Sequence, residues 1–250
     1  MRLFDPSAFC GFFYAHRGLY DNTRGVPENS LPAFRAAAEK GYGVELDVQL
    51  SSDGAVVVFH DNTLDRVCGV HGSVADRSLA ELRQLKLLGT GEVIPLFTDV
   101  LDVLQEGAGP LIVELKAGKR NAELCRKTRN LLRDYTGVYC VESFAPAIIT
   151  WFKRNAPEII RGQLAMPRQD YAAGLNPLLA RMLSSCRFSF LNRPDFIAYK
   201  IGPRPARILR MRKKGVLLIG WTSRDYEKDA KENDGVIFEY CTPPLRYDQL

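Results

Sequence analysis

The stretch VELDVQLSSDGAVVVFH, residues 44–60, contains two short apolar runs that carry or precede chemically active side chains. Glu45 and Asp47 alternate with aliphatic residues in the first run, and His60 follows the second run. Successive side chains of a strand point to opposite faces, so residues two apart share a face. The alternation therefore predicts a strand over 44–49 that presents two carboxylates together.

Two further apolar runs also carry chemically active side chains. LIVELK, residues 111–116, places Glu114 and Lys116 two positions apart, and His16 ends the run FFYAH, residues 12–16. Carboxylates can hold a hard divalent cation, imidazoles transfer protons near neutral pH, and an ammonium can contact a phosphate oxygen. A single such residue at a strand end is more often a satisfied polar group. Three acids buried together, however, require a cation or a base, so the pattern indicates a catalytic site.

Short β-rich runs alternate with helical patterns along the chain, which is typical of repeated strand and helix units around a parallel sheet. We expect strands over 12–16, 44–49, 56–60, 111–115, 138–143, 159–164, 188–198, 216–221 and 235–238. This is one strand more than the eight of a closed barrel, and 188–198, interrupted by Asn192 and Pro194, is the least regular. Helices are predicted over 31–40, 79–88, 98–105, 121–134, 146–155, 176–184 and 205–214, the first with Ser30 as N-cap and Gly41 as its stop.

Motifs spread over most of the chain carry a family resemblance. They are AHRG (15–18), PENSLPAF (27–34), VELDVQLSSDGAVVVFHDNTLDR (44–66), SLAELRQLKLLGTGEVIPLFTDVL (78–101), VELK (113–116), ESF (142–144), GWT (220–222) and NDGVIF (233–238). Each motif alone recurs by chance, but their order and spacing are specific. Through them the chain resembles the glycerophosphodiester phosphodiesterase family.

The resemblance implies an α/β fold, namely a TIM-type (β/α)8 barrel, as a single domain over 1–250 with an insertion at about 61–96. That insertion would lie near the barrel mouth and form part of the substrate pocket. The implied activity is metal-dependent hydrolysis of a glycerophosphodiester to glycerol 3-phosphate and an alcohol. The implied cofactor is one divalent cation, Mg²⁺ or Ca²⁺, on Glu45, Asp47 and Glu114, whose oxygen ligands suit such ions.

The resemblance also assigns roles to side chains outside the cation site. Proton transfer as general acid and base falls to His16 and His60. The substrate-binding residues contact the phosphate or the glycerol carbons, and they are Arg17, Lys116, Phe144 and Trp221. Aromatic residues at strand ends are more often ordinary core, and this alternative stays open for the last two. Glu28 would support the site without contacting the substrate, and Asp61 would orient His60 or, as we favour, simply turn the chain.

Two segments depart from the family pattern. Residues 19–26 are longer than the usual step between the first two motifs, and Glu239 stands where the family usually has aspartate. The roles of both are left open. Head-group preference, the native metal, the oligomeric state, and the choice between direct water attack and a cyclic phosphate are also open.

Composition and charge bear on the cellular compartment and the substrate that we expect for the protein. The net charge of +5 favours an anionic substrate, although a solvated basic surface explains it equally well. Six cysteines without C-x-x-C spacing indicate free thiols. The N-terminal residues lack a secretory apolar region, and no run approaches the roughly 20 apolar residues of a membrane span. We expect a cytoplasmic protein with a small-molecule substrate and no integral membrane segment.

Three other functions are weighed against this hypothesis. A lysophospholipase D-like phospholipase on the same barrel would need an apolar groove or a membrane-facing patch. A catalytically inactive binding protein would be attractive if a histidine or carboxylate were missing, and none is. Nucleic-acid binding through the basic run 204–214 is disfavoured, because apolar residues at helical spacing indicate an amphipathic surface helix there.

Overall fold

A computed structural model describes residues 3–250, so residues 1–2 of the predicted domain 1–250 lie outside the described part. The described chain divides into two compact units, one of residues 14–139 and one of the residues before 14 and after 139. Each unit is described by itself. The single domain stays a prediction.

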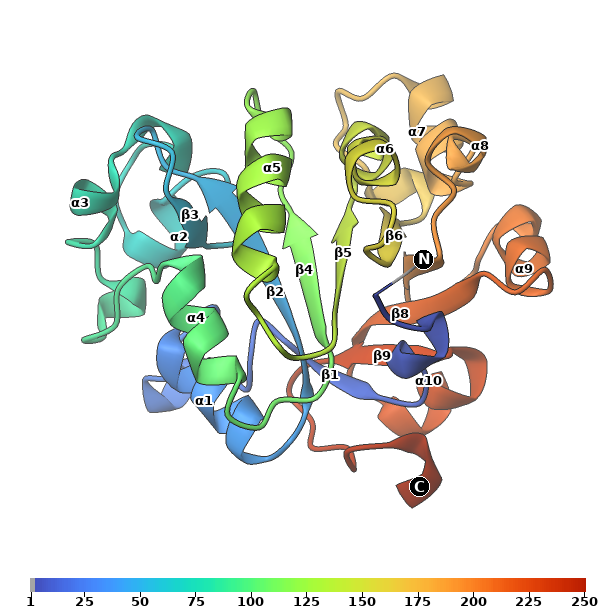
Figure 1. Ribbon diagram of the computed structural model, residues 1–250, viewed down its shortest axis with the longest axis horizontal. Coiled ribbons are helices and arrows are strands. Elements are labelled where there is room, and N and C mark those ends of the chain that lie inside the picture. The colour runs from blue at the N-terminus through green and yellow to red at the C-terminus, as the bar shows by residue number, and fades with distance from the viewer. Residues whose placement is uncertain (1–2) are drawn as a thin grey trace. The chain divides into compact units, whose positions relative to one another are not determined.

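The unit of residues 14–139 is built on three parallel strands and one antiparallel strand (Figure 1). The central strand β2 (Gly43–Leu50) pairs in parallel with β1 (Phe13–His16) and β4 (Leu111–Leu115), and antiparallel with β3 (Val56–Val58). Its helices are α1 (Leu31–Glu39), α2 (Asp65–Cys68), α3 (Leu79–Leu82), α4 (Phe97–Leu104) and α5 (Asn121–Leu132), with 3₁₀ turns at Asn22–Arg24, Val74–Asp76 and Leu87–Gly89.

Every residue of β2 is buried, including the polar ones. Because the side chains alternate, the aliphatic residues of β2 lie on one face and Glu45, Asp47 and Gln49 on the other. The adjacent α1 begins as predicted, since Ser30 accepts a hydrogen bond from the Ala33 amide at 3.4 Å. The predicted strand 44–49 and helix 31–40 are therefore confirmed.

The predicted insertion, residues 61–96, forms a compact substructure between β3 and α4. Apolar side chains from its short helices and loops pack with one residue of β3 and one just after it into a core of their own, namely Val57, Phe59, Leu64, Val67, Val74, Leu82, Leu87 and Ile94. The helix predicted over 79–88 ends at Leu82 in the structure, so the prediction is wrong for residues 83–88. Leu88 adopts a left-handed φ of 50° and Gly89 a φ of 73°, so the chain turns instead of continuing the helix.

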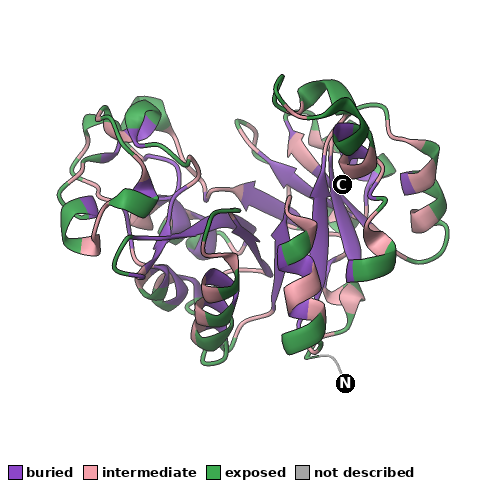
Figure 2. Cartoon of the chain, turned by 90° about the horizontal axis from the view of Figure 1, so that it is seen from above, coloured by how far each residue is buried: buried purple, intermediate pink, exposed green. Residues whose placement is uncertain are grey.

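The other unit contains five parallel strands in the order β5 (Tyr139–Ser143), β6 (Arg161–Ala165), β7 (Phe196–Lys200), β8 (Leu217–Ser223) and β9 (Gly235–Phe238). The helices between these strands are α6 (Pro146–Asn155), α7 (Pro177–Ser184), α8 (Ser189–Asn192), α9 (Ala206–Arg212) and α10 (Tyr226–Glu232). Three 3₁₀ turns complete the unit, Pro6–Phe9, Arg168–Asp170 and Tyr247–Gln249. The strands of both units are coloured mostly as buried in Figure 2.

The surplus strand is β3, not the irregular segment 188–198. The first part of that segment forms α8, and its last part begins β7, which is paired on both sides. Among residues 3–250, eight parallel strands thus follow one another with at least one helix between each pair, in the order of a TIM-type (β/α)8 barrel, with β3 as an addition and a 3₁₀ turn after β9. The predicted fold class is confirmed.

Two expectations about composition can also be compared with the structure. All six cysteines are free, three of them buried and three partly exposed. None of the described helices has the length and apolar composition needed to cross a bilayer.

Candidate functional site

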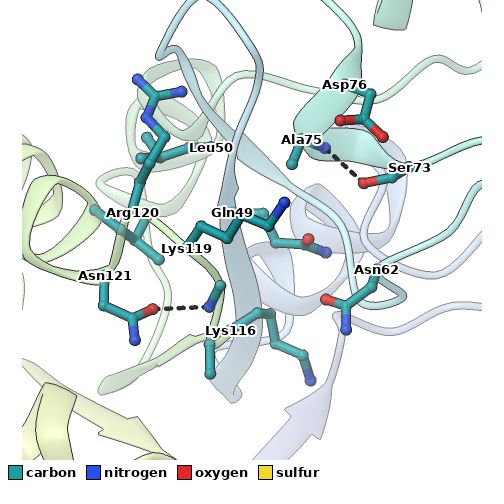
Figure 3. Close-up of a pocket in the computed structure, with 13 residues that line it drawn as sticks. Gln49, Leu50, Asn62, Ser73, Ala75, Asp76, Lys116, Lys119, Arg120 and Asn121 are labelled. Atoms are coloured by element: carbon teal, nitrogen blue, oxygen red, sulfur yellow. Dashed lines mark hydrogen bonds between the residues drawn. The ribbon is translucent and has the colours of Figure 1, made fainter.

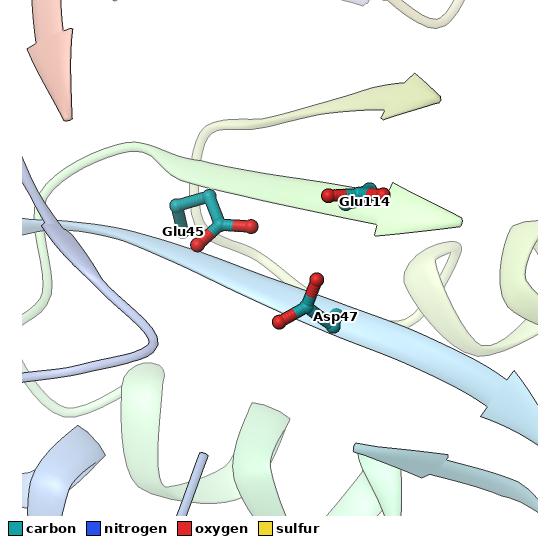
Figure 4. A group of neighbouring side chains, drawn as sticks. All are labelled: Glu45, Asp47 and Glu114. Carbon is teal, nitrogen blue, oxygen red and sulfur yellow. The ribbon is translucent and has the colours of Figure 1, made fainter. Parts of the chain in front are cut away.

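Three carboxylates converge in the unit of residues 14–139 (Figure 4). Glu45 and Asp47 project from one face of β2, and Glu114 lies on β4 directly across from Asp47 in the strand register. Each residue offers an oxygen within 4.8 Å of the others. The three are only 3%, 1% and 7% exposed, respectively. The shared face of Glu45 and Asp47 that the alternation predicted is therefore present, and Glu114 joins them from the neighbouring strand.

Lys116 closes one side of the carboxylate group. Its Nζ lies 2.9 Å from Glu114 Oε1 and 3.2 Å from Asp47 Oδ1. Burial raises the pKa of Glu114 to about 6, and the charge of Asp47 adds to this shift. Burial also opposes ionisation of Asp47, but the charges of Lys116, His60 and Arg17 hold the pKa of that carboxyl well below its usual range.

The donor set suits a hard divalent cation. Asp47 Oδ1 is buried and has no hydrogen-bond donor, even though Lys116 is nearby. Burying three carboxylates costs free energy unless positive charge compensates them, and oxygen ligands are those that Mg²⁺ and Ca²⁺ prefer. The residues present therefore fit the cation that the sequence motifs imply.

The turn after β1 aims Arg17 at this group. Arg17 has a left-handed φ of 57° and Gly18 a φ of 82°. A side chain on Gly18 would approach the Ala33 backbone to 2.8 Å, so glycine is required there. The Arg17 guanidinium donates to Glu28 Oε1 at 2.6 Å, and its Nε lies 3.6 Å from Asp47 Oδ2.

Asn29 reaches Asp47 from the neighbouring segment. It also adopts a left-handed φ of 54°, and its amide Nδ2 donates to Asp47 Oδ2 at 2.9 Å. The Asn29 backbone N–H donates to the Arg17 carbonyl at 3.0 Å. Left-handed non-glycine residues cost free energy and cluster at functional sites. The contact with Asp47 gives Asn29 a place beside the carboxylate group in addition to its position just before α1.

His60 reaches the site because β3 runs antiparallel to β2. The sequence placed His60 at the end of a barrel strand, but the chain instead doubles back, and the Phe59 N–H donates to the Asp47 carbonyl at 2.9 Å. Gln49 fixes the following turn, since its Nε2 donates to the carbonyls of Phe59 and Asp61 at 2.7 and 2.8 Å.

Asp61 orients the His60 ring. His60 Nδ1 lies 2.6 Å from Asp61 Oδ1. Because a carboxylate only accepts, Nδ1 carries the proton, and Nε2 is left as an acceptor in the neutral ring. Burial lowers the pKa of His60. The negative charge of Asp47 raises this pKa, whereas the positive charges of Lys116 and Arg17 lower it further. Sequence reasoning favoured a plain turn here, whereas the structure gives Asp61 an orienting contact.

Sequence reasoning missed Arg66, on α2 of the insertion. Its guanidinium donates to both oxygens of Glu28 at 2.7 and 2.8 Å and to both oxygens of Asp61 at 2.6 and 3.1 Å. Glu28 in turn contacts Arg17, and Asp61 contacts His60. Through Glu28 and Asp61, Arg66 therefore links the segment that carries Arg17 to the segment that carries His60. The only available signal was its place at the end of the motif 44–66.

The remaining predicted residues fall into both units. His16 lies beside the acidic group, with its Nε2 3.9 Å from Glu45 Oε2. Phe144 and Trp221 belong to the other unit, where their rings pack edge to face with centroids 5.7 Å apart. Their contact with a substrate stays a prediction.

Comparison with known proteins is consistent with this geometry. A glycerophosphodiester phosphodiesterase of Caldanaerobacter subterraneus subsp. tengcongensis is 40% identical over 111 residues, which cover 42% of this chain and 44% of that protein. Human glycerophosphodiester phosphodiesterase 1 is 24% identical over 94% of this chain and 78% of its own length. A solved phosphodiesterase of Oleispira antarctica, in complex with the product sn-glycerol-3-phosphate, has a TM-score of 0.76 at 24% identity and covers 98% of both chains.

The profile of one protein family matches nearly the whole chain. It is described as the glycerophosphoryl diester phosphodiesterase family, and the match extends over residues 16–239, which include every residue assigned to the site above. The chain therefore belongs to the glycerophosphoryl diester phosphodiesterase family, a class of phosphoric diester hydrolases.

Proposed function

We propose that this chain hydrolyses glycerophosphodiesters to glycerol 3-phosphate and an alcohol, with one divalent cation, Mg²⁺ or Ca²⁺, held by Glu45, Asp47 and Glu114. The observation that carries the proposal is the convergence of these buried carboxylates beside Lys116. The relative from Oleispira antarctica, with glycerol 3-phosphate bound, supports the choice of product. When bound, the cation supplies Lewis acidity that offsets charge on the phosphoryl oxygens.

Arg17 and Lys116 bind the phosphate in this mechanism. Both are cationic and lie at the carboxylate group, so a dianionic or monoanionic phosphate brought there meets positive charge from two directions. The planar guanidinium can contact two oxygens, whereas the ammonium acts as a point charge. Glu28 holds Arg17 in place and is proposed to have no contact with the substrate.

His16 and His60 share the proton transfers. One imidazole removes a proton from the nucleophile, which is either water or the glycerol hydroxyl of the substrate, and the other protonates the leaving alkoxide. His60 suits the exchange of a proton at Nε2 because Asp61 fixes its other nitrogen. Phe144 and Trp221 are proposed to contact the glycerol carbons. A cytoplasmic location is supported by the free cysteines.

Turnover of two substrates tests the proposal. Purified protein is assayed on glycerophosphocholine and on lysophosphatidylcholine, in EDTA and after addition of excess Mg²⁺ or Ca²⁺. We expect metal-dependent release of glycerol 3-phosphate from glycerophosphocholine, and loss of this activity in Asp47→Asn. Turnover that persists in EDTA would contradict the metal site. Hydrolysis of only lysophosphatidylcholine would instead indicate a lysophospholipase D-like enzyme, and binding without turnover an inactive binding protein.

A further inference from the structure

A cavity of about 360 Å³ opens beside the carboxylate group, within the unit of residues 14–139 (Figure 3). The end of β2 and the loop from β4 to α5 line one side of it, and the insertion lines the other. Its volume falls in the range of roughly 300 to 1,000 Å³ that small-molecule sites occupy. Neither the proposed cation ligands nor the histidines line it.

Three of the residues that line the cavity each lie two positions after a residue of the site. Gln49 is two residues beyond Asp47, Lys116 two beyond Glu114, and Asn62 two beyond His60. On the strand β2, a step of two residues keeps the same face, so Gln49 lies next to Asp47 on the face that carries the carboxylates. Lys116 belongs both to the cavity and to the carboxylate group, because it lines the cavity and its Nζ contacts Asp47 and Glu114. A group attached to a phosphate at Lys116 can therefore extend into the cavity.

Several neutral polar groups in the lining have hydrogen-bonding capacity to spare. Asn62 is exposed, and among the described residues its side-chain amide makes no hydrogen bond within the protein. Asn121 Oδ1 accepts from the Gly118 N–H at 2.7 Å, which leaves its NH₂ group available. Ser73 Oγ accepts from the Ala75 N–H at 3.1 Å, which leaves its hydroxyl proton available. These groups face the cavity from both sides (Figure 3).

The lining carries three cationic side chains, Lys116, Lys119 and Arg120, against one acid, Asp76, so it keeps a surplus of positive charge. Arg120 is engaged by Glu123 and by the carbonyls of Ser51 and Ser52. No aromatic ring is present among the described residues of the lining, so it offers no face for a quaternary ammonium, which aromatic side chains recognise.

We propose that this cavity binds the leaving alcohol and selects a hydroxyl-rich head group, such as glycerol or a cyclitol, over choline. The inference rests on the proposed function and names its substrate class. Hydroxyl groups donate and accept at once, so they pair with the amides of Asn62 and Asn121 and with the Ser73 hydroxyl. A trimethylammonium group pairs with none of them.

The test compares kcat/KM for glycerophosphoglycerol, glycerophosphoinositol and glycerophosphocholine in the metal-loaded enzyme. Each neutral hydrogen bond contributes a factor of about 2 to 12. We therefore expect the wild-type enzyme to prefer the two polyol substrates by about tenfold. Asn62→Leu should lower kcat/KM for the polyol substrates by about fivefold and leave glycerophosphocholine unchanged within about twofold.

Asn130→Leu is the matched control, because it makes the same substitution at an exposed position on α5 that does not line the cavity. It should leave all three values unchanged. A preference for glycerophosphocholine, or an equal loss on all three substrates in Asn62→Leu, would overturn the head-group assignment while leaving the proposed function intact. Absence of turnover on every substrate would overturn the proposed function, and this assignment with it.

Discussion

At the scale of single residues, Asp47 is contacted by polar or cationic side chains on both of its carboxylate oxygens. Arg17 and Asn29 approach one of its oxygens, and Lys116 approaches the other. The side chain is 1% exposed, so it lacks solvation by water, and these neighbours compensate its charge. The carboxylate can therefore stay ionised in a buried position, as an anionic cation ligand must.

The roles of Lys116 and Glu114 can be separated by substitution. An ammonium cannot ligate a cation, so Lys116→Met should lower kcat by about two to three orders of magnitude while metal affinity is unchanged or slightly higher. Glu114→Gln removes an anionic ligand and should weaken metal binding. Titration calorimetry with Ca²⁺ or Mg²⁺ and steady-state kinetics measure both effects. A large loss of metal affinity in Lys116→Met, or none in Glu114→Gln, would reverse this division of roles.

The histidines should matter for turnover more than for folding. His16→Ala and His60→Ala should each lower kcat by about two to four orders of magnitude, because the proton transfers lose their acid or base. Circular dichroism and thermal unfolding serve as the controls for folding. Near wild-type turnover of a substrate with a poor alkoxide leaving group would show that the substituted histidine does not transfer the proton.

At the scale of elements, the antiparallel strand β3 and the helix α2 bring two distant side chains to the site. The return of β3 along β2 places His60 near Asp47, and α2 presents Arg66 to Glu28 and Asp61. The sequence predicted the strands from their apolar runs, but an apolar run does not show whether its strand is parallel or antiparallel. For the same reason β3 was not recognised as the additional strand.

Arg66 should act as a positioning residue. Arg66→Met removes the bonds to Glu28 and Asp61, so Arg17 and His60 lose their fixed supports, and kcat/KM should fall by about 10- to 100-fold. Arg66→Lys should restore little activity, because an ammonium cannot reproduce the planar fork that bonds both carboxylates. Nitrogen NMR of the His60 ring supplies a second readout, since its Nδ1 signal should change in both variants.

Arg83 provides the control for this substitution. It lies in the same insertion, its side chain is 47% exposed against 48% for Arg66, and it pairs with Asp99 at 2.6 Å, away from the site residues. Arg83→Met should therefore keep kcat/KM within about twofold of the wild-type value. An equal loss of activity in the two methionine variants would mean that the insertion needs its surface ion pairs only for stability.

At the scale of the whole molecule, the sequence predicted the fold class and the proximity of the three carboxylates, but not the connections between the surrounding residues. Alternation within one strand is local, so the convergence of Glu45 and Asp47 follows from β geometry alone. The link from Arg66 to Glu28 joins residues 38 positions apart and depends on how the insertion folds. No local pattern encodes that contact, and the same holds for the cavity between the insertion and the β4 to α5 loop.

Cation binding should stabilise the whole chain, because the three ligands lie on two strands and come together only in the folded state. A ligand that binds only the native state at about 100 times its Kd adds about 2.7 kcal/mol, which for a chain of this size raises Tm by about 5 to 10 °C. Thermal unfolding in EDTA and in millimolar Ca²⁺ or Mg²⁺ measures this difference. Asp47→Asn should abolish the metal-dependent rise, whereas Asp99→Asn, which changes an acid outside the carboxylate group, should retain it. Equal Tm values for the wild-type protein with and without either cation would show that the buried carboxylates are compensated by Arg17 and Lys116 alone.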